Sequence, residues 1–412
     1  MSTRTLDRPD RASRRTQAGD RDPRRSRSRT RAGPPEASGT YLLLVGVIAV
    51  LVTIGVVMVL SASSVLSLTS YGSAWYFFQR QLIWTLIGVI AFAVIVRIDY
   101  HRWASAVRPL LAATCVLLVA VLVPGIGVYV GGSRRWLGIG AWRFQPSELA
   151  KIAVLLFAAD LLTRRADELH NSRRVLRPLL LVLVIVGTLV LLEPDLDSTV
   201  LLALIVGSVM VAGGITARHL TLLGGTGIAL SGLLAIAAPY RQARVFTFLH
   251  PTADPSNTGY QIVQSLIALG SGGIEGVGLG AGRSKWLFLP NAHTDFIFAV
   301  IGEELGLIGT LSVLGLFGAF AMLGIRTAQR APDRFGMLLA TGVTVWVVAQ
   351  AAVNIGGVIG LLPVSGIPLP FVSFGGSSLV FTMVAAGILA NVARQTPRAT
   401  SRVPNHAPNR AG

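Results

Sequence analysis

The chain has 412 residues, of which 52% are apolar and only 13% are charged, and its formal net charge is +17. This balance excludes a soluble globular protein, because span-length apolar windows recur along the chain. A disulfide framework is excluded too, since Cys115 is the only cysteine. We therefore expect an all-α polytopic membrane protein.

The positive charge is concentrated at the two ends of the chain. Residues 1–38 contain eleven arginines among polar residues, and residues 396–412 are similar in kind. Both are expected to be disordered cytoplasmic tails that flank a membrane domain over residues 39–395. A basic tail beside a membrane span more often contacts anionic membrane lipids than nucleic acid, so no nucleic-acid partner is expected.

Ten apolar runs predict ten transmembrane helices. They fall near residues 41–61, 80–97, 109–130, 148–163, 178–192, 198–213, 219–239, 296–325, 337–361 and 377–392. Arginines gather in the connections after runs two, four and eight, which places these connections and both termini in the cytoplasm. The alternate connections are then outside.

The longest outer connection, residues 240–295, lies between helices 7 and 8. Its apolar first half predicts a short interfacial helix over residues 260–269, followed by a glycine-rich turn region. The glycines match neither of the usual phosphate-binding patterns, so the sequence does not support a nucleotide site.

The outer segment at residues 131–147 combines tryptophans with arginines. Trp136 is most simply interpreted as a membrane-interface anchor. Positive charge on the outer side needs more explanation, because it runs against the usual bias. The basic residues of interest are Arg134, Arg135, Arg241, Arg244 and Lys285. Such groups suit a phosphate or pyrophosphate, and scattered solvated charge is the alternative.

The fourth run begins with a charged pair. Pro146 fits a first helical turn, and Glu148 and Lys151 then share one helix face at a spacing of three residues. Inside a membrane they should pair with each other or face a polar cavity. A structural ion pair and a substrate-binding pair both remain open, because burial alone forces pairing.

The eighth run starts within LPNAHTDFIFAVIGEELG, residues 289–306. One alternative is that Thr294 or Asp295 only caps the helix; the other is that Asp295 acts alone as a general base, with His293 as a neighbouring substrate contact. As one straight helix, residues 296–325 would be about 45 Å long, so the first turns should protrude or line a cavity. Glu303 and Glu304 would lie about 12 to 14 Å from Asp295, too far for a glycosidase-like carboxylate pair.

Two further outer stretches are rich in prolines and polar residues. LEPDLDST, residues 192–199, predicts a tight turn in which Asp197 or Ser198 caps the next helix. PVSGIPLPFVSFGGSS, residues 363–378, predicts irregular backbone that forms part of a site wall, with Ser373 and Ser377 as candidate substrate contacts. An ordinary outer loop is the alternative for that second stretch.

Several of these stretches together resemble a known family. RRWLGIGAWRFQPSELAK, EPDLDS, GYQIVQS, LPNAHTDFIFAVIGEELG and GIPLPFVSFGGSS resemble, in that order, the motifs of the SEDS family (shape, elongation, division and sporulation). The resemblance covers roughly residues 41–395. MVLSASSV, TGYQIVQSLIALGSGG and the arginine-rich tail look more like the division-type branch, FtsW, than the elongation-type branch, RodA.

The resemblance implies a peptidoglycan glycosyltransferase that polymerises lipid II outside the cytoplasmic membrane, at the division septum. It also implies a class B penicillin-binding protein as transpeptidase partner, with other division proteins. The family's essential aspartate falls on Asp295, its motif glutamate and lysine on Glu148 and Lys151, and its loop tryptophan on Trp136. Asn291 and Asp197 depart from the family pattern, which often has Glu and Gly there.

The mechanism that follows uses Asp295 as the base that deprotonates the acceptor sugar's 4-hydroxyl. The outer basic residues, with Mg²⁺ or Mn²⁺ if a cation binds near Asp295, would offset charge on the pyrophosphate leaving group. One rival is a lipid II flippase, which needs polar groups throughout the membrane depth, whereas here they crowd the outer side. The other rival is a division scaffold, which should tolerate Asp295→Ala.

Overall fold

The computed structural model describes residues 39–130, 133–140, 142–168, 172–216 and 259–396, with scattered positions between 217 and 258. The predicted seventh helix at residues 219–239 lies largely outside the described residues. Arg241, Arg244 and the tails at residues 1–38 and 397–412 lie outside them as well.

Nine of the predicted membrane helices lie on helices of the described chain. They are α1 (Gly39–Tyr71), α2 (Tyr76–Arg97), α3 (Trp103–Leu122), α4 (Pro146–Arg164), α5 (Ser172–Leu192), α6 (Leu196–Ala212), α10 (Ile297–Gln329), α11 (Arg334–Val358) and α12 (Ser377–Gln395). Among the described residues, seven helices are long and apolar enough to cross a membrane. The chain is therefore a multi-pass helical membrane protein, and the count of ten spans stays a prediction.

Two of the nine helices fall outside that group of seven for simple reasons. The 19-residue helix α4 carries four charged side chains, and α6 has only 17 residues. Burial explains how Glu148 and Lys151 are tolerated, because α4 packs against α3, α6 and α11. Asp160 and Arg164 lie in the last turns of α4 and pair with each other over 2.8 Å.

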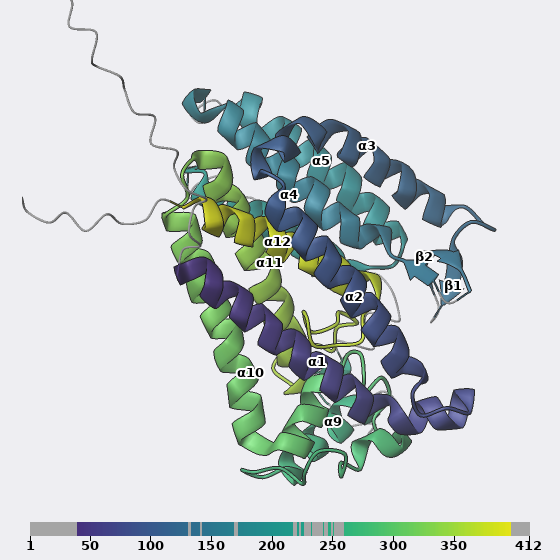
Figure 1. Cartoon of the computed structure of the whole chain (residues 1–412). Coiled ribbons are helices and arrows are strands. Elements are labelled where there is room, and N and C mark those ends of the chain that lie inside the picture. The colour runs from purple at the N-terminus through teal and green to yellow at the C-terminus, as the bar shows by residue number, and fades with distance from the viewer. Residues whose placement is uncertain are drawn as a thin grey trace, which may run out of the picture. The chain divides into compact units, whose positions relative to one another are not determined.

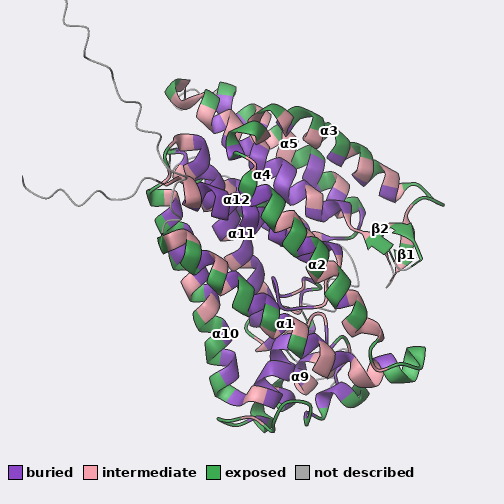
Figure 2. Ribbon diagram, in the orientation of Figure 1, coloured by how far each residue is buried: buried purple, intermediate pink, exposed green. Residues whose placement is uncertain are grey.

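The helices differ in how far they are covered by protein (Figures 1 and 2). In the most apolar 18-residue stretch of each helix, 78% of the residues are buried in α12, but only 22% are buried in α2 and in the span that contains α3. α12 packs on α2, while α11 packs on α10 and α6. Buried polar side chains such as Lys151 of α4, Gln350 of α11 and Asn391 of α12 therefore lie inside the helix bundle, where hydrogen-bond partners replace lipid.

The third predicted span ends earlier than expected. α3 stops at Leu122, since Pro124 and Gly125 follow and a proline does not continue a helix. Residues up to 130 instead enter a small antiparallel sheet of β1 (Val128–Val130), β2 (Ser133–Ile139) and β3 (Trp142–Phe144), in that order. The outer segment is thus a folded β-unit.

The run at residues 296–325 is not one straight helix. α10 bends at Gly306, whose φ of 64° and ψ of −160° are accessible only to glycine. The bend frees backbone groups, and the glycine-rich segment 272–282 pairs with them: Leu307 N donates to Gly273 O over 3.0 Å, and Gly278 N to Glu304 O over 3.0 Å. The predicted turn region is therefore the partner of the broken helix.

Short helices complete the described chain. They are α9 (Tyr260–Ser271), the 3₁₀ turns η1 (Tyr100–Arg102) and η2 (Ala166–Glu168), and the π-type turn η3 (Ser284–Phe288). α9 confirms the helix predicted at residues 260–269.

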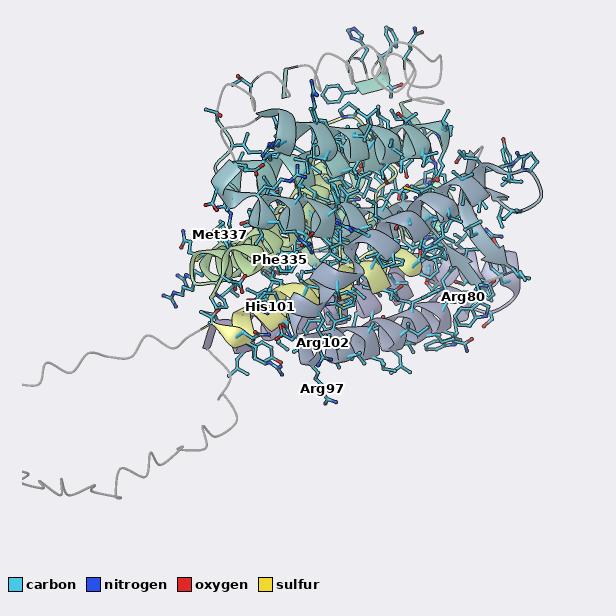
Figure 3. All side chains as sticks on the ribbon, turned by 90° about the horizontal axis from the view of Figure 1, so that it is seen from above. Arg80, Arg97, His101, Arg102, Phe335 and Met337 are labelled. Atoms are coloured by element: carbon cyan, nitrogen blue, oxygen red, sulfur yellow. The ribbon has the colours of Figure 1, made fainter. Side chains whose placement is uncertain are left out.

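The arginine-rich connections meet at one end of the bundle (Figure 3). Arg97 and Arg102 lie at the same end as Met337 of α11, while Arg80 lies toward the other end of α2. His101 joins the two connections, with Nδ1 2.7 Å from an Asp99 oxygen and Nε2 2.8 Å from an Asp333 oxygen. Their common end is what the positive-inside assignment requires.

Candidate active site

Asp295 lies in a tight turn directly before α10. Asn291 adopts a positive φ of 56°, which Asn tolerates better than most residues, and its carbonyl accepts hydrogen bonds from the N–H groups of residues 294, 295 and 296. The N-cap residue of α10 is Phe296, directly after Asp295. Its side chain is half-buried.

This turn is fixed to two other parts of the chain. Asn354 of α11 donates through Nδ2 to the carbonyl of Asp295 over 2.9 Å and to that of Ile367 over 2.8 Å. Ser373 Oγ donates to the carbonyl of Thr294 over 2.6 Å, and Phe374 N to that of His293 over 3.0 Å. The turn therefore has little freedom to shift.

The proline-rich stretch at residues 363–376 is irregular backbone, as predicted. Its residues Ile367, Leu369, Phe371 and Val372 are buried, so it is not an ordinary outer loop. The carbonyls of Ile367 and Pro368 in this stretch accept hydrogen bonds from side chains of α11, as irregular backbone at membrane depth requires.

The predicted pair of Glu148 and Lys151 is confirmed. Lys151 Nζ lies 2.8 Å from Glu148 Oε1, and both side chains are almost completely buried. Lys151 also donates to Gln350 Oε1 over 3.3 Å and lies 5.0 Å from the centroid of the Trp346 ring. Gln350 Nε2 in turn donates to the carbonyl of Pro368 over 3.0 Å.

The side chains of α11 that connect these groups were not predicted from the sequence. Trp346, Gln350 and Asn354 are spaced by four residues and share one helix face. Gln350 and Asn354 hold the consecutive carbonyls of Pro368 and Ile367. A signal was available, because two amide side chains four residues apart inside an apolar run are costly in a membrane unless they have partners.

The two outer arginines have different roles. Arg135 Nε donates to the carbonyl of Glu193 over 2.9 Å, and its Nη2 donates to that of Pro194, so it supports the turn between α5 and α6. Arg134 is exposed on β2. The Glu193 side chain is fully buried, and desolvation, with the charge of Asp195, raises its pKa to about 9 despite nearby Arg135. Trp136 is half-buried and faces Val128 in the sheet.

A polar cluster joins the start of α6 to the start of α4. Asp195, and not Asp197 or Ser198, caps α6 by accepting from Ser198 N over 3.1 Å. Asp195 also accepts from Gln145 Nε2 over 3.1 Å, and Gln145 N donates to Ser377 Oγ over 3.3 Å. The predicted cap at the start of this helix is confirmed, but the predicted capping residue was wrong, because a capping side chain precedes the first helical turn.

The side chain of Lys285 binds other groups of the protein. Its Nζ lies 3.4 Å from a Glu304 oxygen and donates to the carbonyl of Gly280, and its side chain is only 6% exposed. Glu304 also accepts from Ser61 Oγ over 2.6 Å, while Glu303 accepts from the backbone N–H groups of residues 283 and 284. These carboxylates hold the glycine-rich segment against the bend in α10.

His293 is packed against aromatic rings. Its ring centroid lies 4.6 Å from that of Phe77 and 5.6 Å from that of Phe374. Burial lowers its pKa to about 4, so the imidazole is neutral near pH 7. A neutral ring in this position can shape the wall beside Asp295, but it carries no charge to offer a phosphate.

Among the described residues, no cluster of metal-binding side chains surrounds Asp295. No group of three or more His, Cys, Asp or Glu side chains in the described part of the chain could hold an ion. Glu303 and Glu304 are bound to the glycine-rich segment. We therefore derive no step through a divalent cation.

A family model described as "cell cycle protein", for FtsW, RodA and SpoVE, matches residues 41–398. The chain belongs to the FtsW/RodA/SpoVE family.

The curated relatives are similar over most of their length. The probable peptidoglycan glycosyltransferase FtsW of Mycobacterium tuberculosis is 44% identical over 378 residues, which are 91% of this chain and 72% of the relative. Stage V sporulation protein E of Bacillus subtilis is 42% identical over 354 residues, which are 86% of this chain and 96% of the relative.

Solved structures show the same fold. A chain from a study titled "Structural coordination of polymerization and crosslinking by a peptidoglycan synthase complex" matches with a TM-score of 0.70 and 30% identity, over 85% of this chain and 96% of that one. The rod shape determining protein RodA of Thermus thermophilus matches with a TM-score of 0.62 and 27% identity, over 86% of this chain and 97% of its own.

Proposed function

We propose that this chain polymerises lipid II into glycan strands on the outer face of the cytoplasmic membrane during cell division. Its enzyme class follows from relatives about 40 to 44% identical over most of the chain: it is a peptidoglycan glycosyltransferase. The observation that carries the residue assignment is the fixed turn that presents Asp295 where α10, α11 and the segment 363–376 meet.

Asp295 acts as the general base in this proposal. Its carboxylate removes the proton of the acceptor sugar's 4-hydroxyl as the oxygen attacks the anomeric carbon of the lipid-linked donor. The new glycosidic bond forms while the bond to undecaprenyl pyrophosphate breaks, and the electron pair leaves with the pyrophosphate. Two hydrogen bonds to the backbone of residues 294 and 295 support this role, because a positioned base is worth about 10² to 10⁴ in rate.

The exposed arginines are the best candidates to receive the pyrophosphate. Arg134 on β2 and Arg283 beside η3 are exposed, whereas Arg135 and Lys285 are hydrogen-bonded within the protein. Guanidinium groups bind phosphate oxygens in pairs and would offset the charge that develops on the leaving group. Lys151 and Glu148 act through Gln350 on the backbone beside Asp295 rather than by contact with the pyrophosphate.

The partner and location belong to the same proposal. One structural neighbour comes from a synthase complex that coordinates polymerisation with crosslinking. A class B penicillin-binding protein is the partner of matching chemistry, with other division proteins at the septum. A cytoplasmic position of both termini is part of the proposal, and the arginine-rich connections support it through the positive-inside rule.

The deciding experiment is glycan polymerisation from fluorescent lipid II by the purified protein with its transpeptidase partner. Asp295→Asn is compared with wild type and with Thr327→Val, which removes a buried hydroxyl at the opposite end of α10. Glycan from wild type and Thr327→Val but not from Asp295→Asn supports the proposal. Equal glycan from all three contradicts the base assignment. If none makes glycan while proteoliposomes flip lipid II, the flippase alternative holds.

A further inference from the structure

The turn η3, just before the turn that carries Asp295, has its charged side chain inside and its apolar side chains outside. Lys285 is 7% exposed and lies 3.4 Å from a Glu304 oxygen. Trp286, Leu287 and Phe288, which follow it, are 55 to 61% exposed. A turn in contact with water normally does the opposite, because charged side chains are solvated there and large apolar ones are buried. The reversal indicates that η3 faces an apolar medium.

The backbone of η3 allows these three consecutive side chains to be exposed together. In a regular helix, successive side chains are about 100° apart, so three in a row do not share one face. Leu287 instead has a φ of 69°, a left-handed conformation that leucine adopts only at a cost, and Trp286 has a non-helical ψ of 40°. Such a conformation persists where the surroundings compensate for it, and contact of all three side chains with lipid would do so.

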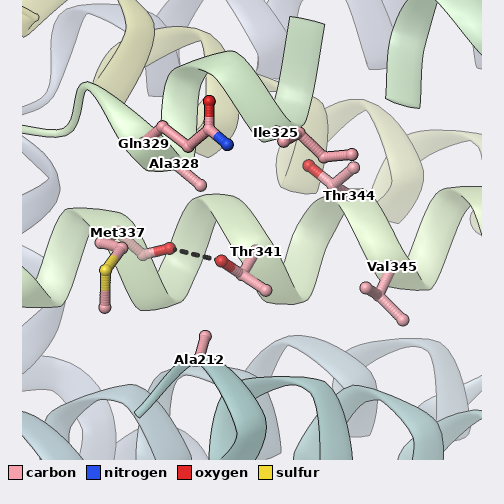
Figure 4. A pocket seen from close by; sticks show the side chains of 8 residues that line it. All are labelled: Ala212, Ile325, Ala328, Gln329, Met337, Thr341, Thr344 and Val345. Carbon is pink, nitrogen blue, oxygen red and sulfur yellow. Dashed lines mark hydrogen bonds between the residues drawn. The ribbon is translucent and has the colours of Figure 1, made fainter. Parts of the chain in front are cut away.

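The helix α10 shows at which level of the membrane η3 lies. Large exposed apolar side chains recur along it from Leu307, just after the bend at Gly306, to Ile325 (Figure 2). This exposed stripe is about 27 Å long, close to the hydrocarbon thickness of about 30 Å. Beyond its inner end, the polar side chain of Gln329 follows Ile325 by one helical turn (Figure 4). The bend at Gly306 therefore lies at the outer edge of the hydrocarbon.

The helix α1 gives the same level independently. It begins at Gly39, and Ser61 is about 33 Å further along the helix, again close to one hydrocarbon thickness. Ser61 Oγ donates to Glu304 over 2.6 Å. Because Glu304 also holds Lys285, η3 is fixed at the outer edge of the hydrocarbon by both helices.

The glycine-rich segment extends the same apolar surface. Ile308 N donates to the carbonyl of Ile274 over 3.2 Å, so this segment lies beside the outer end of the exposed stripe of α10. Ile274 and Leu279 are exposed as well. Glu275 and Arg283 are also exposed, and such charges are tolerated among lipid headgroups but are costly within the hydrocarbon. The segment therefore belongs at the boundary between headgroups and acyl chains.

We propose that residues 273–288, which we call the interfacial segment, insert into the outer leaflet of the membrane. Trp286, Leu287 and Phe288 then lie among the acyl chains just below the headgroups. Tryptophan favours this level, because its ring contacts acyl chains while its N–H stays near water. The interfacial segment is continuous with the exposed stripe of α10, and this continuity selects lipid as the occupant of the surface.

The interfacial segment leads directly into the turn of Asp295. Leu289 is buried and joins Phe288 to that turn, in which the carbonyl of Asn291 accepts hydrogen bonds from the following residues. Anchoring Phe288 in the leaflet would hold Asp295 at a fixed height above the hydrocarbon, on the side where the sugars of a lipid-linked substrate lie. This consequence rests on the proposed role of Asp295, whereas the insertion itself does not.

Spin-label accessibility of the full chain in nanodiscs of phosphatidylethanolamine and phosphatidylglycerol tests the insertion. Cys115→Ala removes the native thiol, and a nitroxide is attached at Trp286→Cys or Phe288→Cys. Its collisions with oxygen, which concentrates in hydrocarbon, are compared with its collisions with a nickel chelate, which stays in water. Leu311→Cys on the exposed stripe of α10 is the lipid reference, and Arg102→Cys on the exposed connection before α3 is the water reference.

We expect the ratio of oxygen to nickel collisions at Trp286→Cys and Phe288→Cys to be at least five-fold above that at Arg102→Cys and close to that at Leu311→Cys. A ratio equal to that at Arg102→Cys would overturn the proposal, because η3 would then lie in water. Low collision rates with both reagents and an immobilised spectrum would overturn it too, because protein rather than lipid would then cover η3. These measurements do not use glycan transfer, so the insertion can fail while the proposed function holds.

Discussion

Replacing Asn354 by Ala tests whether the turn that carries Asp295 must be held in place. Asn354 is 2% exposed, and its Nδ2 joins the carbonyl of Asp295 to that of Ile367. Each hydrogen bond contributes about 1 kcal/mol, so the substitution removes about 2 kcal/mol of the interaction that holds the Asp295 turn in place. If this loss appears in the barrier, the turnover number falls about 30-fold.

The assay is the rate of glycan formation at saturating and at limiting lipid II. We expect kcat to fall while KM changes less than about three-fold, because the substituted group orients the base rather than the substrate. Thr327→Val is the matched control, since its hydroxyl only donates to the carbonyl of Leu323 within α10.

Two results would refute this reasoning. A variant with unchanged kcat would show that the turn keeps its position without the amide. A loss that appears wholly as a higher KM, with kcat unchanged, would show that Asn354 acts on substrate binding rather than on the base. A fall in thermal midpoint without a fall in kcat would mark a structural role only.

Three more predictions concern stability, each measured as the thermal midpoint in detergent. Lys151→Met should lower the free energy of unfolding by about 3 to 5 kcal/mol, because it leaves Glu148 buried and unpaired. Adding Glu148→Gln should recover part of this loss. An equal loss in the single and the double variant would contradict this. Gly306→Ala should lower the free energy of unfolding by about 3 kcal/mol or more, because the new Cβ would lie 2.4 Å from backbone atoms. Gly318→Ala, which has open space around it, should be neutral or stabilising. Similar effects of the two substitutions would contradict this. The pKa of the buried His293 ring is about 4 in the folded chain, against about 6.5 in the unfolded chain. The free energy of unfolding should therefore fall by up to about 3 kcal/mol as the pH drops from about 6.5 to about 4. An equal fall in His293→Phe would contradict this.

Much of the candidate site could be found from residue types alone. A lone carboxylate before an apolar run marked Asp295, and the spacing of three residues predicted that Glu148 and Lys151 would pair. Lys285 shows the limit of this approach. Its charge on the outer side suggested a phosphate contact, but Glu304 reaches it only because α10 bends at Gly306 and the glycine-rich segment folds back.

The hydrogen bonds formed by Gln350 and Asn354 of α11 show the same limit. Gln350 and Asn354 could be marked as polar residues in an apolar run, but not as the links between Lys151 and the turn of Asp295. Those links pass through the carbonyls of Pro368 and Ile367, and any residue has a carbonyl. Sequence patterns therefore do not show which backbone groups a side chain will find.

The sequence by itself determined that this protein crosses a membrane, where most of its helices lie, and which charged residues need a reason to be there. Hydropathy and charge are local properties that act through the cost of placing each group in lipid. The tertiary structure alone decided which charges are satisfied internally, how the backbone of residues 363–376 is held, and which side chains of η3 are exposed. Those outcomes depend on contacts between residues far apart in the chain, and only the packed helices bring such residues within hydrogen-bond distance.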